Sequence, residues 1–350
     1  MKKILLKVAL TCYVLLLSNN LFAQITSIPN PEFEQALISL GIDSDLTING
    51  QVLTSDINTK TILNVSAYPS ISDLTGIGDF SALKTLWADN TSINSLDLSA
   101  NSNLTSLDIS NTSITSLGFV SNIANLSTLY ARSLSLLSVT ISNNALTDLD
   151  LSNNTILTDV NISNTAIRSL NLDQNTALTD LNVSNTTMLT DLDISQNTAL
   201  ATLNVSNSVL ETLNISNTLN LASVDFSTAA ALTVLLAGNS GLSTLDLSTN
   251  TALTNLDLEG NTALIDLDLS NNTALTDLSV YNTALTSLNV SNTAITGSNL
   301  RVDLVLLLED LNISNTELSN LDFSQNTALT GLNVSNTTML TDLDISQNTA

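Results

Sequence analysis

One spacing constrains this sequence more than any other feature: an apolar motif returns about every 11 residues along most of the chain. In residues 178–200, LTDLNVSNTTMLTDLDISQNTAL, the first half Leu-x-x-Leu181-Asn-Val183-Ser is repeated by the second half, Leu-x-x-Leu192-Asp-Ile194-Ser. A fixed period of this kind indicates a stack of similar structural units, each of which buries its apolar face against its neighbours.

The central Leu or Val of each half-unit can serve as a marker, and the markers form two interleaved series. Within a series, successive markers are 20 to 23 residues apart, usually 21 or 22, so one coil takes about 21 residues and has two similar sides. We call them the first side and the second side. The first-side markers are Leu86, Leu107, Leu129, Leu149, Leu170, Leu192, Leu213, Leu235, Leu256, Leu278, Leu300, Leu321 and Leu343. The second-side markers are Leu96, Leu117, Val139, Val160, Leu181, Leu203, Val224, Leu245, Leu267, Leu288, Leu311 and Leu332.

The start of the chain has the pattern of a secretory signal. Lys2 and Lys3 precede an apolar run from Ile4 to Leu17, and a small-residue cleavage site ends at Ala23. The run is too short to span a membrane comfortably. We therefore expect residues 1–23 to be a signal peptide and the mature protein to be secreted or displayed on the outer cell surface, with no membrane insertion after the signal is removed.

The cysteine content and the net charge limit the disulfides and the classes of binding partner that we expect. The only Cys, Cys12, lies in the expected signal, so the mature chain has no disulfide. Removal of the three lysines of the signal changes the net charge from -24 to -27. So acidic a protein is repelled by nucleic acid and by anionic membrane surfaces, and neither is an expected partner.

Residues 24–60 differ from the repeats and predict an N-terminal cap. Asn30-Pro31 reads as an N-cap and first helical residue, and Phe33, Ala36, Leu37 and Leu40 follow with helical spacing. A short amphipathic helix over residues 30–41 would cover the apolar end of the first coil. The carboxylates at 43 and 45 with the polar residues at 47 and 49 also resemble part of a calcium loop, although the terminal glutamate of such a loop is absent.

From about Thr61 to Ala350 the repeats predict strands. In Thr-Asp-Leu-Asp-Ile-Ser, apolar and polar residues alternate, so Leu192 and Ile194 point inward while Asp191 and Asp193 point outward. Asn-Thr or Asn-Thr-Ala then turns the chain. We expect a mainly β repeat solenoid of about 12 coils of 21–22 residues, with two parallel sheets, or one sheet and one extended row, and helix almost confined to the cap and the segment around Ser55.

The pattern Leu146-x-x-Leu149-x-Leu151-x-x-Asn154 resembles that of leucine-rich repeats. The second Leu-Asp-Leu in each coil resembles a 21-residue class found in secreted bacterial surface proteins. The cap, IPNPEFEQALISLGIDSDLTINGQVLTSDI, is similar to the caps of such proteins and more distantly to those of internalins. The resemblance covers the mature chain and implies the fold, whereas the partner differs between members of such families. Thr replaces Asn at positions such as Thr186 and Thr293, so the asparagine ladder of this family is incomplete.

The chain stops at Ala350 inside a unit whose earlier copy continues. Residues 332–350 repeat residues 181–199 without a change. A solenoid ending there would expose core and unpaired strand edges. We interpret the sequence as a fragment, or as one that lacks its C-terminal cap.

The residues available for chemistry do not favour an enzyme. There is no His, and no Cys beyond the signal. The acidic residues recur in register instead of converging, so pairs such as Asp266 and Asp268 are interpreted as a solvated face rather than as acid–base pairs. We expect no cofactor, although calcium bridging between stacked aspartates is an alternative. An ice-binding row of Thr is a further alternative, which Asp, Asn and Ser interrupt.

The residues that break the repeat fall on the first side. Its outward strand positions or nearby turns hold every Trp and Tyr of the mature chain and four of its five basic residues, and the second side has none. Aromatic and Arg side chains anchor many protein interfaces. The candidate partner-binding face comprises Trp87, Tyr130, Arg132, Val234, Leu236, Tyr281 and Arg301.

Two functions remain open. The first is an exported or surface-displayed binding module that engages a protein or a glycan in adhesive or other interactions. The second is an acidic structural spacer, ordered by calcium or not, without a specific ligand. The one-sided aromatic residues favour the first, and the monotony of the other repeats favours the second.

Overall fold

A computed structural model describes residues 24–142, 145–297 and 299–349. The described chain divides into two compact units, one ending at Ile114 and the other beginning at Thr115. Both units consist of short parallel strands that recur about every 21 residues, and together they make about 13 turns. The expected signal peptide lies outside the described residues.

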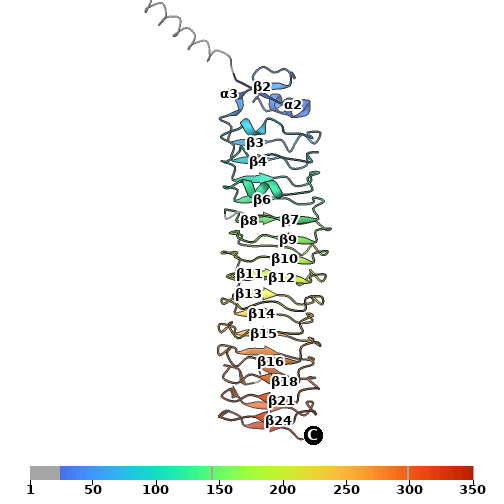
Figure 1. Ribbon diagram of the computed structural model, residues 1–350, viewed down its shortest axis with the longest axis vertical. Coiled ribbons are helices and arrows are strands. Elements are labelled where there is room, and N and C mark those ends of the chain that lie inside the picture. Colours follow the sequence, from blue (N-terminus) through green and yellow to red (C-terminus); the bar gives the residue numbers. More distant parts are fainter. Residues whose placement is uncertain (1–23, 143–144, 298, 350) are drawn as a thin grey trace, which may run out of the picture. The chain divides into compact units, whose positions relative to one another are not determined.

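The first unit opens with the cap. Strand β1 (Ile25–Ser27) pairs antiparallel with β2 (Gln51–Leu53), and helices α2 (Pro31–Ser39) and α3 (Thr54–Ile57) flank them (Figure 1). Helix α2 starts as the sequence predicts, because the Asn30 side chain accepts a hydrogen bond from the Phe33 N–H at 2.8 Å. The Phe33 ring stacks on Phe80, with centroids 6.5 Å apart, so the helix covers apolar side chains of the first coils.

The repeats of the first unit follow the cap. Strands β3 (Ile62–Asn64), β4 (Thr85–Trp87) and β5 (Ser106–Asp108) pair in parallel with Leu63, Leu86 and Leu107 in register. A single 3₁₀ turn, η1 (Ile77–Asp79), lies between β3 and β4. These three leucines are buried in the core of this unit.

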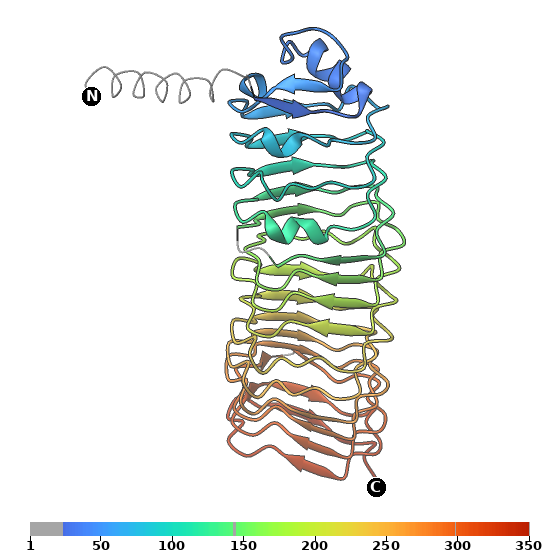
Figure 2. The same ribbon diagram turned by 45° about the horizontal axis from the view of Figure 1, so that its top comes forward.

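In the second unit, strands lie on both sides of the coil, as Figures 1 and 2 show. A 3₁₀ turn, η2 (Gly118–Asn122), precedes them, and β19 (Thr296–Gly297) pairs with β22 (Glu317–Leu318) in the turns. The first-side strands are β6 (Thr128–Tyr130), β8 (Asp148–Asp150), β11 (Asp191–Asp193), β13 (Thr212–Asn214), β14 (Val234–Leu236), β15 (Asn255–Asp257), β17 (Asp277–Ser279), β20 (Leu300–Arg301), β23 (Asn320–Asp322) and β25 (Asp342–Asp344). The second-side strands are β7 (Ser138–Thr140), β9 (Asp159–Asn161), β10 (Asp180–Asn182), β12 (Thr202–Asn204), β16 (Asp266–Asp268), β18 (Ser287–Asn289), β21 (Asp310–Asn312) and β24 (Gly331–Asn333).

The predicted alternation is confirmed on these strands. Leu192 and Ile194 are buried, while Asp191 and Asp193 on the same strand are exposed. Marker leucines pair with marker leucines, as Leu213 does with Leu192 and Leu235 in the ladder of β11, β13 and β14. The predicted mainly β leucine-rich repeat solenoid, with parallel strands on both sides and little helix, is therefore confirmed.

Two kinds of turn connect the sides of the coil. Where Asn lies four residues after the end of the strand, its buried amide reaches the preceding coil. The amide of Asn197 donates to the carbonyls of Leu172 and Asn175 at 3.0 and 2.9 Å. Where Thr takes this place, its hydroxyl closes its own coil, as Thr186 does on the Val183 carbonyl at 2.8 Å. Asn therefore ties coils together and Thr shapes single turns, which explains why the asparagine ladder is interrupted.

Candidate interaction surface

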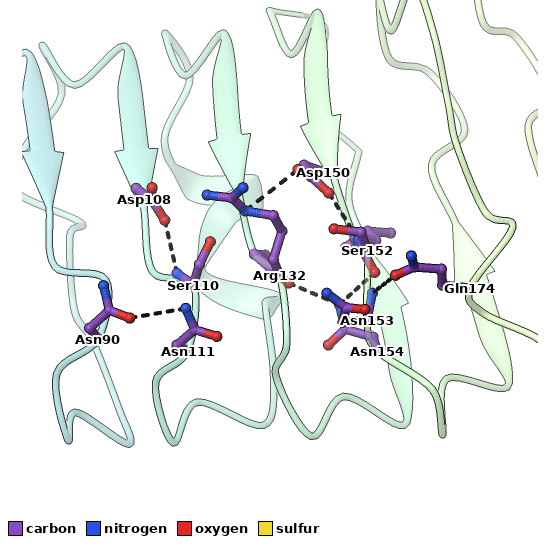
Figure 3. Close-up of polar contacts among 12 residues, drawn as sticks. Asn90, Asp108, Ser110, Asn111, Arg132, Asp150, Ser152, Asn153, Asn154 and Gln174 are labelled. Atoms are coloured by element: carbon purple, nitrogen blue, oxygen red, sulfur yellow. Dashed lines mark hydrogen bonds and ion pairs between the residues drawn. The ribbon is translucent and has the colours of Figure 1, made fainter.

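Most strands end in a side-chain turn that gives the repeated Asp and Asn residues a structural role. The residue after the marker accepts a hydrogen bond from the N–H two residues later: Asp150 accepts from Ser152 at 2.9 Å and Asn182 accepts from Ser184 at 3.0 Å. Figure 3 shows this contact at Asp150 and, in the first unit, at Asp108. Such Asx turns satisfy a backbone donor where strand pairing ends. The Asx hydrogen bond at the end of each such strand thus explains why Asp and Asn recur in the repeats.

The same contacts shift the titration of these carboxyl groups. The hydroxyl and the N–H of Ser248 bond to the Asp246 carboxylate and hold its pKa below the ordinary value, and Ser227 acts in the same way on the pKa of Asp225. Hydrogen bonds to the charged form favour that form. These aspartates remain ionised as part of the turn.

Four large residues occupy this Asx position on first-side strands: Trp87, Tyr130, Leu236 and Arg301. None of them has a short side-chain acceptor, so each gives up the Asx hydrogen bond that Asp or Asn would form. The exceptions at the same position of the second side, Gly118 and Thr140, are small. The fold therefore lacks the stabilising Asx hydrogen bond at the four first-side positions that hold these large side chains.

Tyr130 and Arg132 form one cluster in the second unit. The Arg132 guanidinium lies over the Tyr130 ring, 5.7 Å from its centroid, and its Nε is 3.5 Å from Asp150 Oδ2 (Figure 3). The ring is 38% exposed. The cation–π and ionic contacts place the guanidinium beside the ring and the Asp150 carboxylate.

Tyr281 and Arg301 form a second cluster in the same unit. Arg301, on β20, lies over the Tyr281 ring at 5.3 Å and is 4.0 Å from the carboxylate of Glu259. The arginine thus reaches across two preceding coils. Both clusters combine an aromatic ring, an arginine and an acidic neighbour.

The remaining predicted residues lie apart from these clusters. Val234 and Leu236 are half-buried on β14, where Leu236 lines an open hollow of about 380 Å³ with Leu170 and Asn214. Trp87 belongs to the first unit, is 39% exposed and pairs in register with Asn64 and Asp108. The second unit therefore carries three separate groups along its first side, not one pocket.

Sequence reasoning missed three leucines that follow β20. Leu304, Leu306 and Leu307 are 39%, 52% and 56% exposed. The next coil carries Gln, Thr and Ala at these three places, at positions 325, 327 and 328, so the apolar stretch Leu-Val-Leu-Leu-Leu at 304–308 was the signal that could have found them.

The described residues contain no group of three or more Asp, Glu, His or Cys arranged to hold a metal ion. Within the same residues, no helix has the length and apolar character needed to cross a membrane.

No protein-family model and no curated protein matches the chain. Solved structures do match. The functional domain of InlJ from Listeria monocytogenes is 27% identical, over 88% of this chain and 75% of that one, with a TM-score of 0.34. The internalin InlF from Listeria monocytogenes is 18% identical over 93% and 99%, and a leucine-rich repeat protein from Leptospira interrogans is 18% identical over 80% and 85%, each with a TM-score of 0.36. By its own repeat spacing, its buried marker leucines and its two rows of parallel strands, the chain has the fold of a leucine-rich repeat solenoid.

Proposed function

We propose that this protein is an exported or surface-displayed binding module that engages a protein partner, in adhesion or another interaction, through the first side of its second unit. The observation that carries the proposal is the cluster of Tyr130, Arg132 and Asp150. It places an exposed ring and a pre-positioned guanidinium where the repeat otherwise has Asp and Ser. Tyr and Arg are the residues whose truncation most often weakens protein complexes.

The loss of Asx turns supports this interpretation. A residue that removes a stabilising hydrogen bond and does not pack into the core is expected where function requires it. Tyr130 and Arg301 replace the Asx acceptor, and both are exposed or partly exposed in the clusters described above. Separate groups along many coils suit an extended protein surface, or a long glycan, better than a small molecule.

Export is supported by the charged and apolar segments of residues 1–23, which have the pattern of a secretory signal. Binding is favoured over catalysis because the chain has no His and its acidic residues recur in register. The resemblance of the cap to those of secreted surface proteins points in the same direction.

A structural spacer without a specific ligand is the second candidate. It is favoured by the regularity of the second side, where Asn161, Asn182, Asn204 and their equivalents accept Asx hydrogen bonds one coil after another. A spacer needs only a stable fold and a soluble, acidic surface. It does not require Tyr130 or Arg132.

Capture from the native surroundings, with crosslinking, separates the two candidates. The test variant is Tyr130→Asp with Arg132→Ser, which restores the sequence of the neighbouring coil and its Asx turn. The control is Asn161→Asp with Asn312→Asp, which changes the net charge by the same two units on the second side and keeps both Asx acceptors. A partner captured by the wild type and the control but not by the test variant supports a first-side binding module. No specific capture by any of the three proteins would argue for the spacer, and equal capture of one partner by all three would contradict a first-side binding site.

A further inference from the structure

The turn after β20 departs from every comparable turn in the second unit. Where residues 325–328 read Gln-Asn-Thr-Ala, residues 304–307 read Leu-Val-Leu-Leu. We call Leu304, Leu306 and Leu307 the leucine turn; they are 39%, 52% and 56% exposed. Single exposed apolar residues are ordinary, but several that adjoin one another on a monomer mark an interaction site.

The backbone beneath these leucines is held in place. Val305 takes the position of the ladder asparagine and is buried. The Asn326 amide of the next coil donates to the carbonyls of Val302 and Val305 at 3.2 and 2.9 Å. The turn keeps the geometry of the repeat, so a partner would meet the leucines with little backbone ordering to impose.

Leu304 holds a left-handed conformation, with φ of 57°. The equivalent places in other coils hold Asn239 and Asn282, with φ of 52° and 55°. Asn tolerates this region far better than Leu does. The leucine is therefore present against the local backbone preference, as expected of a residue kept for a contact rather than for the fold.

The leucine turn adjoins the second aromatic cluster. Arg301 precedes Leu304 by three residues and lies over Tyr281 at 5.3 Å. Exposed carboxylates occupy the same coils, among them Asp277, Asp303 and Glu309. The surface here is apolar and aromatic within an acidic surround.

The negative charge of the chain indicates which kind of partner can bind at the leucine turn. A second copy of the chain, at -24, would bring the same negative charge to the contact, as would an anionic membrane or a nucleic acid. A basic partner gains from the carboxylates, and apolar side chains on that partner would cover the leucines. We infer that the leucine turn, with Tyr281 and Arg301, is the docking site for a basic, amphipathic segment of the protein partner. This inference rests on the proposed function and names the partner chemistry.

The test uses variants that return the turn to the repeat. Leu304→Asn, Leu306→Thr and Leu307→Ala together restore the residues of sibling coils, and the Leu306→Thr, Leu307→Ala pair is the second variant if the triple one melts early. The matched control is Leu219→Thr, which removes an isolated leucine that is 69% exposed in a comparable turn of the same unit. The probes are a labelled synthetic peptide of Leu and Lys with amphipathic helical spacing and an oligolysine of equal length, followed by fluorescence anisotropy.

We expect the Leu/Lys peptide to bind the wild type and the control alike, and to bind the restored variants about tenfold more weakly or worse, because burial of even one leucine side chain is worth that factor. Oligolysine should bind all proteins equally. Equal affinity of the Leu/Lys peptide for all proteins would overturn the inference and assign binding to overall charge. A wild type that sediments as a dimer while the restored variants sediment as monomers would also overturn it, since a second copy would then occupy the turn. The Tyr130→Asp, Arg132→Ser variant could fail to capture the partner while the leucine-turn variants bind the peptide as tightly as the wild type does. That result would support the proposed function and contradict this inference.

Discussion

The side-chain amide of Asn175 donates to the backbone carbonyl of Asn154, 3.0 Å away, and Asn154 holds the same place one coil earlier. Both residues are fully buried. The contact joins successive coils through a side chain, in addition to the strand pairing on either side of the coil.

Asn175→Thr should therefore weaken the second unit more than its conservative chemistry suggests. Thr can close its own turn, as Thr186 does, but it cannot reach the preceding coil. The carbonyls of Leu151 and Asn154 would each lose a buried donor, at a cost of about 1–3 kcal/mol in the free energy of unfolding. Urea unfolding followed by circular dichroism measures this, with Thr176→Ser, at an exposed position of the same turn, as the control. A Thr variant as stable as the wild type would show that the ladder adds little.

Acid should destabilise the protein through its Asx turns. The hydroxyl and N–H of Ser248 lower the pKa of Asp246 below its ordinary value. A carboxyl whose folded pKa is depressed stabilises the fold above its unfolded pKa, about 3.9, and this contribution is lost as pH falls through the folded value.

Asp225→Asn with Asp246→Asn keeps both acceptors but removes their titration. We expect this variant to lose less stability than the wild type between about pH 5 and pH 2, a window that contains the ordinary Asp pKa. Urea midpoints across that range provide the measurement. Parallel curves for the two proteins would mean that the Asx carboxylates do not govern acid unfolding.

The cap depends on a buried carboxylate. Glu34 is fully buried and accepts N–H bonds from Asn49, Gly50 and Gln51 at 2.8, 2.9 and 3.1 Å. Glu34→Ala would leave these donors without their acceptor and should cost roughly 3 kcal/mol in the unfolding free energy of the first unit. Trp87 is the only Trp in the chain and belongs to this unit, so its fluorescence reports the loss. The exposed Glu32→Ala is the control, and equal midpoints for the two variants would contradict this role of Glu34.

Calcium is expected to act only as a salt. The hydroxyls of Thr202 and Thr179 bond to the two oxygens of Asp180 at 2.5 and 2.7 Å, and calcium would have to displace them. Millimolar calcium should raise the melting temperature no more than a monovalent salt of the same ionic strength does, since a specific ligand would add its own binding free energy. A clearly larger rise with calcium would favour the calcium-ordered spacer.

The repeat, the strands and the helix of the cap could be predicted from the sequence. A strand with one buried face buries every second residue, and this two-residue spacing is visible in apolar pairs such as Leu192 and Ile194. It did not reveal that Asp150 and Asn182 are turn acceptors, because that role depends on where each strand ends. The candidate partner-binding face stays a prediction, and only the structure shows that Arg132 lies over Tyr130 and Arg301 over Tyr281. The leucine turn was missed because exposure of Leu306 cannot be read from a pattern in which leucines are otherwise core.

The most direct test of first-side binding is the equilibrium affinity of the captured partner for Tyr130→Asp, Arg132→Ser, measured beside its melting temperature. We expect a dissociation constant raised about thirtyfold, which corresponds to roughly 2 kcal/mol for the lost aromatic and arginine anchors. The melting temperature should equal or exceed that of the wild type because the Asx turn is restored. An unchanged dissociation constant in this folded variant, or a larger loss in the second-side control Asn161→Asp, Asn312→Asp, would contradict first-side binding.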